Sequence, residues 1–114
     1  EIYAKDKKEA FKILAQVLFK NSCIRDQDEY IKALFQREHE FSTNIGFGIA
    51  IPHAKNACVI KTSIAVGTFN PPITYDDGEK VRLIFMLAVP NNYNNLHLEI
   101  LKNLSRKLMD DDFY

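Results

Sequence analysis

The segment GFGIAIPHA, residues 46–54, constrains the fold of this 114-residue chain more than any other part of it. Ile49 and Ile51 favour a short β-strand, and the two glycines allow close backbone approach or unusual dihedral angles. Pro52 is expected to end the ladder because it has no N–H donor and a fixed φ. The pattern therefore predicts that His53 lies where a strand ends and a loop begins. A neutral imidazole is nucleophilic at cellular pH and can also take up a proton.

Two helices are predicted ahead of this segment. Residues 6–9 and 26–29 both read Asp-x-x-Glu, which is the form of a capping box, and each precedes apolar residues at helical spacing. The first helix is expected from about Lys7 to Lys20. The second is expected to end near Glu38, so that Arg37 falls in its last turn.

Two longer strands are predicted after the motif. Residues 63–69 alternate apolar and small side chains, and residues 81–89 are almost continuously apolar, which suits a strand covered on both faces. Between them, Pro71-Pro72 and Asp76-Asp77-Gly78 are turn signals.

A last helix is predicted near the end of the chain. An asparagine-rich loop, residues 91–95, precedes leucines that repeat at helical spacing up to Leu108, and His97 falls in the first turn of this helix. The order of elements indicates an α/β fold, a small mixed β-sheet layered with helices in a single domain.

Composition excludes several classes of function. Fifteen basic and fifteen acidic residues cancel, and no block of Lys and Arg appears, so we expect no nucleic-acid partner. The longest apolar run, residues 83–89, is too short to span a bilayer, and no signal-peptide layout is present, so we expect no membrane insertion and a cytoplasmic location. The two cysteines, Cys23 and Cys58, have no metal-binding or redox spacing and receive no role.

Residues 45–54, with Glu38 seven positions before Ile45, resemble the phosphorylation-site signature of the fructose/mannitol-type IIA proteins of the bacterial phosphoenolpyruvate-dependent sugar phosphotransferase system. Residues 33–38 and 97–108 extend the resemblance over nearly the whole chain. The resemblance implies the same fold and one IIA domain over residues 1–114. Family members carry further residues before the first helix and after Phe113, so we expect a domain truncated at both ends.

The resemblance also implies roles for three residues. His53 would be the nucleophile that is phosphorylated, and Arg37 would compensate the charge of the phosphoryl oxygens with planar, permanently charged donors. His97 corresponds to a second active-site histidine, which assists without being phosphorylated. Glu38 belongs to the signature, but we expect it to make a structural hydrogen bond.

Two further positions are weaker candidates. Thr43 could hydrogen-bond a phosphoryl group or shape the turn before the glycines, and the turn is favoured. Phe47 stands where many family members carry a polar residue such as asparagine, and it could form part of an apolar rim for docking a partner protein.

The predicted activity is therefore that of a phosphotransferase without metal or organic cofactor. By resemblance, His53 accepts a phosphoryl group from the histidine-containing phosphocarrier protein and passes it to a cysteine of a IIB domain, either separate or in the same polypeptide, for uptake of a sugar such as fructose or mannitol.

Two alternatives remain open from the sequence. IIA-like domains also serve as regulatory modules, in nitrogen-related control or within transcriptional regulators, where phosphorylation of the same histidine would be a signal. A metal site formed by His39, His53 and His97 is a weaker hypothesis, because their spacing matches no metal-binding motif.

Overall fold

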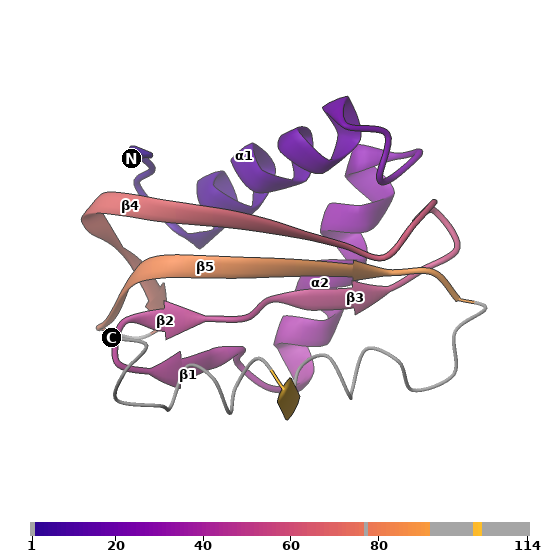
Figure 1. Ribbon diagram of the computed structural model, residues 1–114. Coiled ribbons are helices and arrows are strands. Elements are labelled where there is room, and N and C mark those ends of the chain that lie inside the picture. Colours follow the sequence, from indigo (N-terminus) through magenta and orange to yellow (C-terminus); the bar gives the residue numbers. More distant parts are fainter. Residues whose placement is uncertain (1, 77, 92–101, 104–114) are drawn as a thin grey trace.

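The computed structural model describes residues 2–76, 78–91 and 102–103 of the chain. Within these residues it contains two helices followed by five strands that form one mixed sheet. Both helices pack on the same face of the sheet, so that the described residues form a helix layer and a sheet layer (Figure 1). This architecture confirms the predicted α/β class with a small mixed sheet layered with helices.

Helix α1 spans Lys7–Lys20, as the sequence predicted. The Asp6 side chain caps its first turn by accepting a hydrogen bond from the Glu9 backbone N–H at 2.9 Å. Phe11 and Leu14 lie on the buried side of the helix. Their spacing of three residues places both side chains on the face that packs against the sheet.

Helix α2 spans Gln27–Glu40 and ends two residues beyond the expected Glu38. Asp26 caps its N-terminus by accepting from the Glu29 N–H at 3.0 Å. The last turn contains Arg37, and the C-cap is Phe41, whose N–H bonds the Arg37 carbonyl oxygen. The prediction that Arg37 lies in the last turn is confirmed.

The central strand of the sheet is β5. The strands are β1 (Asn44–Gly46), β2 (Ile49–Ala50), β3 (His53–Lys55), β4 (Ser63–Asp76) and β5 (Glu79–Val89). Strand β5 pairs antiparallel with β4 along one side and parallel with β2 and β3 along the other, while β1 pairs antiparallel with β2. The mostly buried β5 matches the predicted strand covered on both faces.

The prediction that His53 lies where a strand gives way to a loop was wrong, because His53 begins strand β3. Ile49 pairs with Leu83 and His53 pairs with Leu87, so the register is the same on both sides of Pro52 (83 − 49 = 34 and 87 − 53 = 34). Pro52 has no N–H to donate, but its carbonyl oxygen accepts from the Leu87 N–H at 2.9 Å. The proline interrupts the ladder without turning the chain away from β5.

The prediction that Pro71-Pro72 forms a turn between two strands was also wrong. Strand β4 continues through both prolines to Asp76, with an irregular register between Thr68 and Ile73. Ile2 forms a parallel bridge to Phe69 and exchanges backbone hydrogen bonds with residues 68 and 70. A proline is tolerated in such a bulged stretch because no ladder N–H is required of it. The second turn signal is confirmed, since β4 ends at Asp76 and Gly78 precedes β5 with φ of 78°.

The sheet has apolar side chains on both faces. Alternate residues of β5, among them Ile84 and Met86, join the main core beneath the two helices. The intervening residues Leu83 and Phe85 pack with Ile49 and Ile51 in a second cluster on the other face. His53 shares this second face with Leu87, its register partner.

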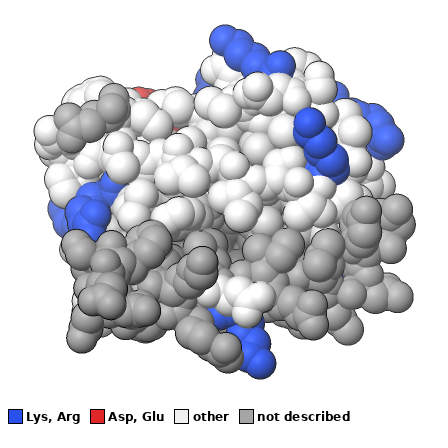
Figure 2. Space-filling view, in the orientation of Figure 1, with Lys and Arg blue, Asp and Glu red and all other residues white. Residues whose placement is uncertain are grey.

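The predicted last helix, with its loop and His97, lies outside the described residues apart from positions 91, 102 and 103. No helix in the described part of the chain is long and apolar enough to cross a membrane. On the face shown in Figure 2, basic side chains of described residues form separate patches near the rim and no continuous stripe. Cys23 and Cys58 are buried free thiols.

Candidate active site

His53 is held at the first position of β3 and is almost completely buried, with 9% of its surface exposed. Its Nδ1 lies 2.9 Å from the Ile51 carbonyl oxygen, and its Nε2 lies 3.1 Å from Arg37 Nε. A carbonyl oxygen can only accept and a guanidinium N–H can only donate. The two hydrogen-bond partners of the ring therefore assign the neutral tautomer of His53, with the proton on Nδ1 and the lone pair on Nε2.

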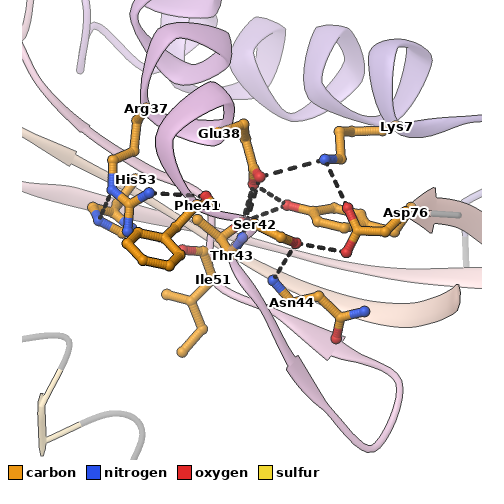
Figure 3. Close-up of polar contacts among 11 residues, drawn as sticks. Lys7, Arg37, Glu38, Phe41, Ser42, Thr43, Asn44, Ile51, His53 and Asp76 are labelled. Carbon is orange, nitrogen blue, oxygen red and sulfur yellow. Dashed lines mark hydrogen bonds and ion pairs between the residues drawn. The ribbon is translucent and has the colours of Figure 1, made fainter.

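Arg37 reaches His53 from the last turn of α2. Its Nε–H donates to His53 Nε2, and its NH1 donates to the Phe41 carbonyl oxygen at 2.9 Å. The guanidinium is thus held at the helix end through two different nitrogens (Figure 3). The structure brings together two of the residues that the sequence marked, although they lie sixteen positions apart in the chain.

The fold explains how these two side chains meet. Helix α2 packs against β3, so that its C-terminal turn lies beside the start of the strand. Buried Tyr30 on α2 donates from its hydroxyl to the Leu87 carbonyl oxygen at 2.8 Å, and Leu87 is the register partner of His53. Burial raises the pKa of Tyr30 well above its ordinary value, which keeps the hydroxyl a donor.

Glu38 follows Arg37 in the chain and points to the other side of the helix end (Figure 3). Its side chain is 4% exposed and accepts from the Tyr75 hydroxyl at 2.6 Å, from the Thr43 backbone N–H and from the Thr43 hydroxyl. Lys7 Nζ lies 3.3 Å from Glu38 Oε2 and also 3.3 Å from an oxygen of Asp76. The structural hydrogen bond predicted for Glu38 is one member of this larger network.

Thr43 is 5% exposed and directs its hydroxyl into the network of Glu38 and Tyr75. The neighbouring Ser42 donates to Asp76 at 2.6 Å, and its oxygen accepts from the Asn44 N–H at 3.2 Å. The structure therefore places Thr43 in contacts that shape the segment before β1, which is the role that the sequence favoured.

Phe47 lies in the turn between β1 and β2, with 68% of its surface exposed. It adopts φ of 60°, and both flanking glycines also have positive φ, so the tight turn needs left-handed conformations at three successive residues. Phe47 lies six residues before His53 in the sequence, and strand β2 (Ile49–Ala50) lies between them. An exposed aromatic that adjoins the Arg37–His53 pair is Phe41, with 76% of its surface exposed, which the sequence analysis did not single out.

The sequence analysis named two further histidines. His39 is exposed on α2. His97 lies outside the described residues. Within residues 2–76, 78–91 and 102–103, no three His, Cys, Asp or Glu side chains gather in a way that could hold a metal ion.

Several contributors to the site were missed by the sequence analysis. The carbonyl groups of Ile51 and Phe41 belong to the backbone, so residue type gives no signal for them. Lys7 did carry a signal, because a cation in the first turn of a helix opposes the helix dipole. Its ion pairs with Glu38 and Asp76 and its position 4.1 Å from the centre of the Tyr75 ring explain why it is there.

The fold and the Arg37–His53 pair define an α/β domain with a buried, oriented histidine at the start of a strand. The chain belongs to the family described as phosphoenolpyruvate-dependent sugar phosphotransferase system, EIIA 2, whose model matches residues 1–114. The resemblance drawn from residues 45–54 is thereby confirmed.

Relatives and solved structures agree with this assignment. The chain is 41% identical to the PTS system fructose-specific EIIABC component of Bacillus subtilis over an alignment of 113 residues. The alignment covers 97% of this chain and 18% of that protein. It is 42% identical to the PTS system fructose-specific EIIA component of Haloferax volcanii over an alignment of 91 residues. The alignment covers 78% of this chain and 59% of that protein. The structure matches nitrogen regulatory protein IIA-Ntr from Neisseria meningitidis with a TM-score of 0.86 and 33% identity, over 97% of this chain and 77% of that one.

Proposed function

We propose that this domain carries a phosphoryl group on Nε2 of His53, taking it from the histidine-containing phosphocarrier protein and giving it to a cysteine of a IIB domain. The observation that supports this most directly is the orientation of the buried His53 ring, whose Nδ1 lies 2.9 Å from the Ile51 carbonyl oxygen while Nε2 faces Arg37. This arrangement keeps the lone pair on the nitrogen beside the cation.

The proposed reaction needs no cofactor. The Nε2 lone pair attacks the phosphorus of the donor's phosphohistidine, an N–P bond forms on His53, and the donor's own N–P bond breaks as its imidazole takes the electron pair. The ring of His53 gains positive charge in this step, and the Ile51 carbonyl oxygen stabilises the Nδ1–H. In the second transfer a IIB thiolate attacks phosphorus, an S–P bond forms, and the electron pair returns to Nε2.

Arg37 has a double role in this proposal. Before transfer, its Nε–H occupies the lone pair of His53 Nε2 and holds the ring in place. As phosphorus approaches Nε2, that hydrogen bond is released, and the guanidinium donors turn to the phosphoryl oxygens, whose charge they compensate. We propose, from the family resemblance, that His97 donates a further hydrogen bond to the phosphoryl group.

The proposed acceptor is supported by the name of the Bacillus subtilis relative, a fructose-specific EIIABC component. This chain spans 18% of that protein and 59% of the Haloferax volcanii relative, which is named a fructose-specific EIIA component. We therefore propose a IIB domain as the acceptor and a sugar of the fructose/mannitol type as the transported substrate. Phe47 is proposed as part of the docking rim, since it is exposed and apolar.

A second candidate function is regulatory phosphorylation. The match to nitrogen regulatory protein IIA-Ntr, at 33% identity and a TM-score of 0.86, favours this alternative. The chemistry on His53 would be the same, but the phosphorylated and unphosphorylated forms would differ in the partner they bind, with no onward transfer to a IIB cysteine. Adding a purified IIB domain to the phosphorylated protein distinguishes the two functions, because only the carrier loses its phosphoryl group.

Intact-mass analysis tests the proposal directly. The wild type, His53→Ala and the control His39→Ala would each be incubated with phosphoenolpyruvate, enzyme I and the histidine-containing phosphocarrier protein. We expect one acid-labile phosphoryl group on the wild type and on His39→Ala, and none on His53→Ala. A wild type that stays unmodified while a known IIA domain is phosphorylated would overturn the proposal.

A further inference from the structure

We infer that Glu38 is a positioning residue for phosphoryl transfer, because its buried carboxylate ties the end of α2 to the segment that orients His53. This inference rests on the proposed function, since it concerns the alignment of Arg37 and His53. Glu38 contacts neither the imidazole nor the guanidinium, so it would act only through the groups it holds.

Residues from several parts of the fold meet at Glu38. Lys7 comes from the start of α1, Tyr75 from β4 and Thr43 from the segment before β1, while Glu38 itself lies on α2. Its side chain is 4% exposed, and donors from all three elements reach its two oxygens. A buried carboxylate with this many donors has little freedom to move, so it fixes the helix end relative to the sheet.

A chain of hydrogen bonds leads from Glu38 to His53. The Thr43 N–H donates to Glu38 at 3.1 Å, and the Thr43 carbonyl oxygen accepts from the Ile51 N–H at 2.9 Å. The Ile51 carbonyl oxygen then accepts from His53 Nδ1 at 2.9 Å. The carbonyl that selects the tautomer of His53 is thus held, through Thr43, by the carboxylate.

Arg37 and Glu38 both bind the turn that follows α2. The chain turns sharply between the end of α2 and Thr43, and this turn is held from two sides (Figure 3). Arg37 NH1 bonds the Phe41 carbonyl oxygen on one side, and Glu38 bonds the Thr43 N–H on the other. Loss of the Glu38 contact would loosen the turn, and with it the carbonyl that holds the guanidinium over Nε2.

The charge of Glu38, and not only its shape, is needed for these contacts. A carboxylate accepts at both oxygens, whereas a glutamine would present an NH2 group to at least one of the donors, Lys7, Tyr75 or the Thr43 N–H. Burial and the neighbouring Glu38 raise the pKa of the Tyr75 phenol, so that it stays a neutral donor. Glu38→Gln should therefore break the network with a minimal change of volume.

The test compares Glu38→Gln with Glu40→Gln, which changes an exposed carboxylate two residues further along α2. The rate of phosphoryl transfer from the phosphorylated phosphocarrier protein would be measured over a range of donor concentrations. We expect Glu38→Gln to lower kcat by roughly 10- to 100-fold with KM changed less than about twofold, because misplacement of reacting groups by about 1 Å has effects of this size. Glu40→Gln should match the wild type.

A second readout follows His53 itself. The 15N chemical shifts of the imidazole report which ring nitrogen carries the proton. The wild type should show the neutral tautomer with the proton on Nδ1, whereas Glu38→Gln should show a mixture of tautomers. A purely structural role would not change these shifts in a variant that remains folded.

A third variant separates positioning from loss of stability. Leu18 is buried near the far end of α1 from Lys7, so Leu18→Ala should lower Tm without touching the network. Even if Leu18→Ala has a Tm equal to or below that of Glu38→Gln, it should accept the phosphoryl group at close to the wild-type rate. It should also retain the wild-type 15N shifts of His53. Glu38→Asp, which keeps the charge on a shorter side chain, should recover part of the lost kcat.

The possible outcomes are distinct. Wild-type kcat in Glu38→Gln, or an equal loss in Leu18→Ala, would overturn the inference. If the wild type itself accepts no phosphoryl group, the proposed function fails, but the 15N experiment still decides whether Glu38 orients His53. Unchanged shifts in Glu38→Gln would overturn the positioning role even then.

Discussion

Two successive residues at the end of α2 face very different surroundings. Arg37 points to a half-buried site where it meets a single imidazole, whereas Glu38 points into a closed network with Lys7, Thr43 and Tyr75. The guanidinium must release His53 for the proposed reaction to proceed, and the carboxylate must stay in place. One helix turn thus carries a charge that the proposed reaction requires to move and a charge that the network holds in place.

This difference has an energetic meaning. A charge that is only partly buried costs little in stability when it is removed, and its value lies in the reaction. A buried carboxylate with several donors behaves in the opposite way, because its removal leaves those donors without an acceptor in a site that excludes water. Substitutions at both positions should therefore slow transfer, but only those at Glu38 should also destabilise the fold strongly.

The largest expected effect on stability is that of Glu38→Ala. Removing the carboxylate leaves the Tyr75 hydroxyl, the Thr43 N–H and the Lys7 ammonium without their shared acceptor, so we expect the free energy of unfolding to fall by about 3 kcal/mol. Urea unfolding, monitored by circular dichroism, measures this free energy. The exposed Glu40→Ala serves as the control and should change the value by less than about 0.5 kcal/mol. Equal losses in the two variants would contradict the comparison.

Arg37→Ala should slow transfer with little loss of stability. We expect transfer to slow by about 100-fold, which corresponds to roughly 2.7 kcal/mol in the barrier, because the proposed donor to the phosphoryl oxygens is lost. The free energy of unfolding should fall by less than about 1 kcal/mol. Rapid-quench measurement of phosphorylated protein gives the rate. Arg37→Lys should recover only part of it, since an ammonium lacks the planar donors; full recovery would show that charge alone matters.

Tyr75→Phe is expected to have a smaller effect on both quantities. It removes one donor from Glu38 while the Thr43 and Lys7 contacts remain, so we expect a loss of about 1 kcal/mol in the free energy of unfolding. The transfer rate should change less than in Glu38→Gln. A Tyr75→Phe variant as slow as Glu38→Gln would mean that the phenol, and not the carboxylate, is the essential part of the network.

Stability should also depend on high pH. Burial raises the pKa of Tyr75 above its ordinary value of 10.0, and burial also raises that of Tyr30. Above about pH 10 the unfolded chain loses these protons while the folded chain keeps them, so stability falls as the pH rises. The urea midpoint, measured from pH 9 to about pH 11.5, should fall less steeply in Tyr75→Phe. If the urea midpoint falls equally steeply with pH in Tyr75→Phe and the wild type, the raised pKa of Tyr75 is contradicted.

The helices were predictable because their signals are local. The two Asp-x-x-Glu caps at residues 6–9 and 26–29 lie next to the residues that they cap, and helical spacing shows which side is buried. The positive φ of Gly46 and Gly48 agrees with the unusual dihedral angles that these glycines were expected to allow, whereas the positive φ of Phe47 is not indicated by its residue type.

The strands were predicted less well where prolines occur. Pro52 and Pro71-Pro72 were expected to end strands, yet the chain continues along β5 past Pro52 and β4 runs through both later prolines. A proline excludes one donor, but whether a donor is required at that position depends on the neighbouring strand. For Pro52 that neighbour is Leu87 on β5, far away in the sequence.

The sequence by itself determined the helix positions, the family signature and the candidate residues Arg37 and His53, because residue type and spacing carry this information. Only the tertiary structure decided that Arg37 Nε meets His53 Nε2, that the Ile51 carbonyl selects the tautomer, and that Lys7 and Tyr75 converge on Glu38. The contacts of Arg37, Lys7 and Tyr75 join elements far apart in the chain. The contact of Ile51 is made by a backbone carbonyl, a group that every residue possesses. The geometry of these contacts follows from how helices and strands pack, which local patterns do not encode.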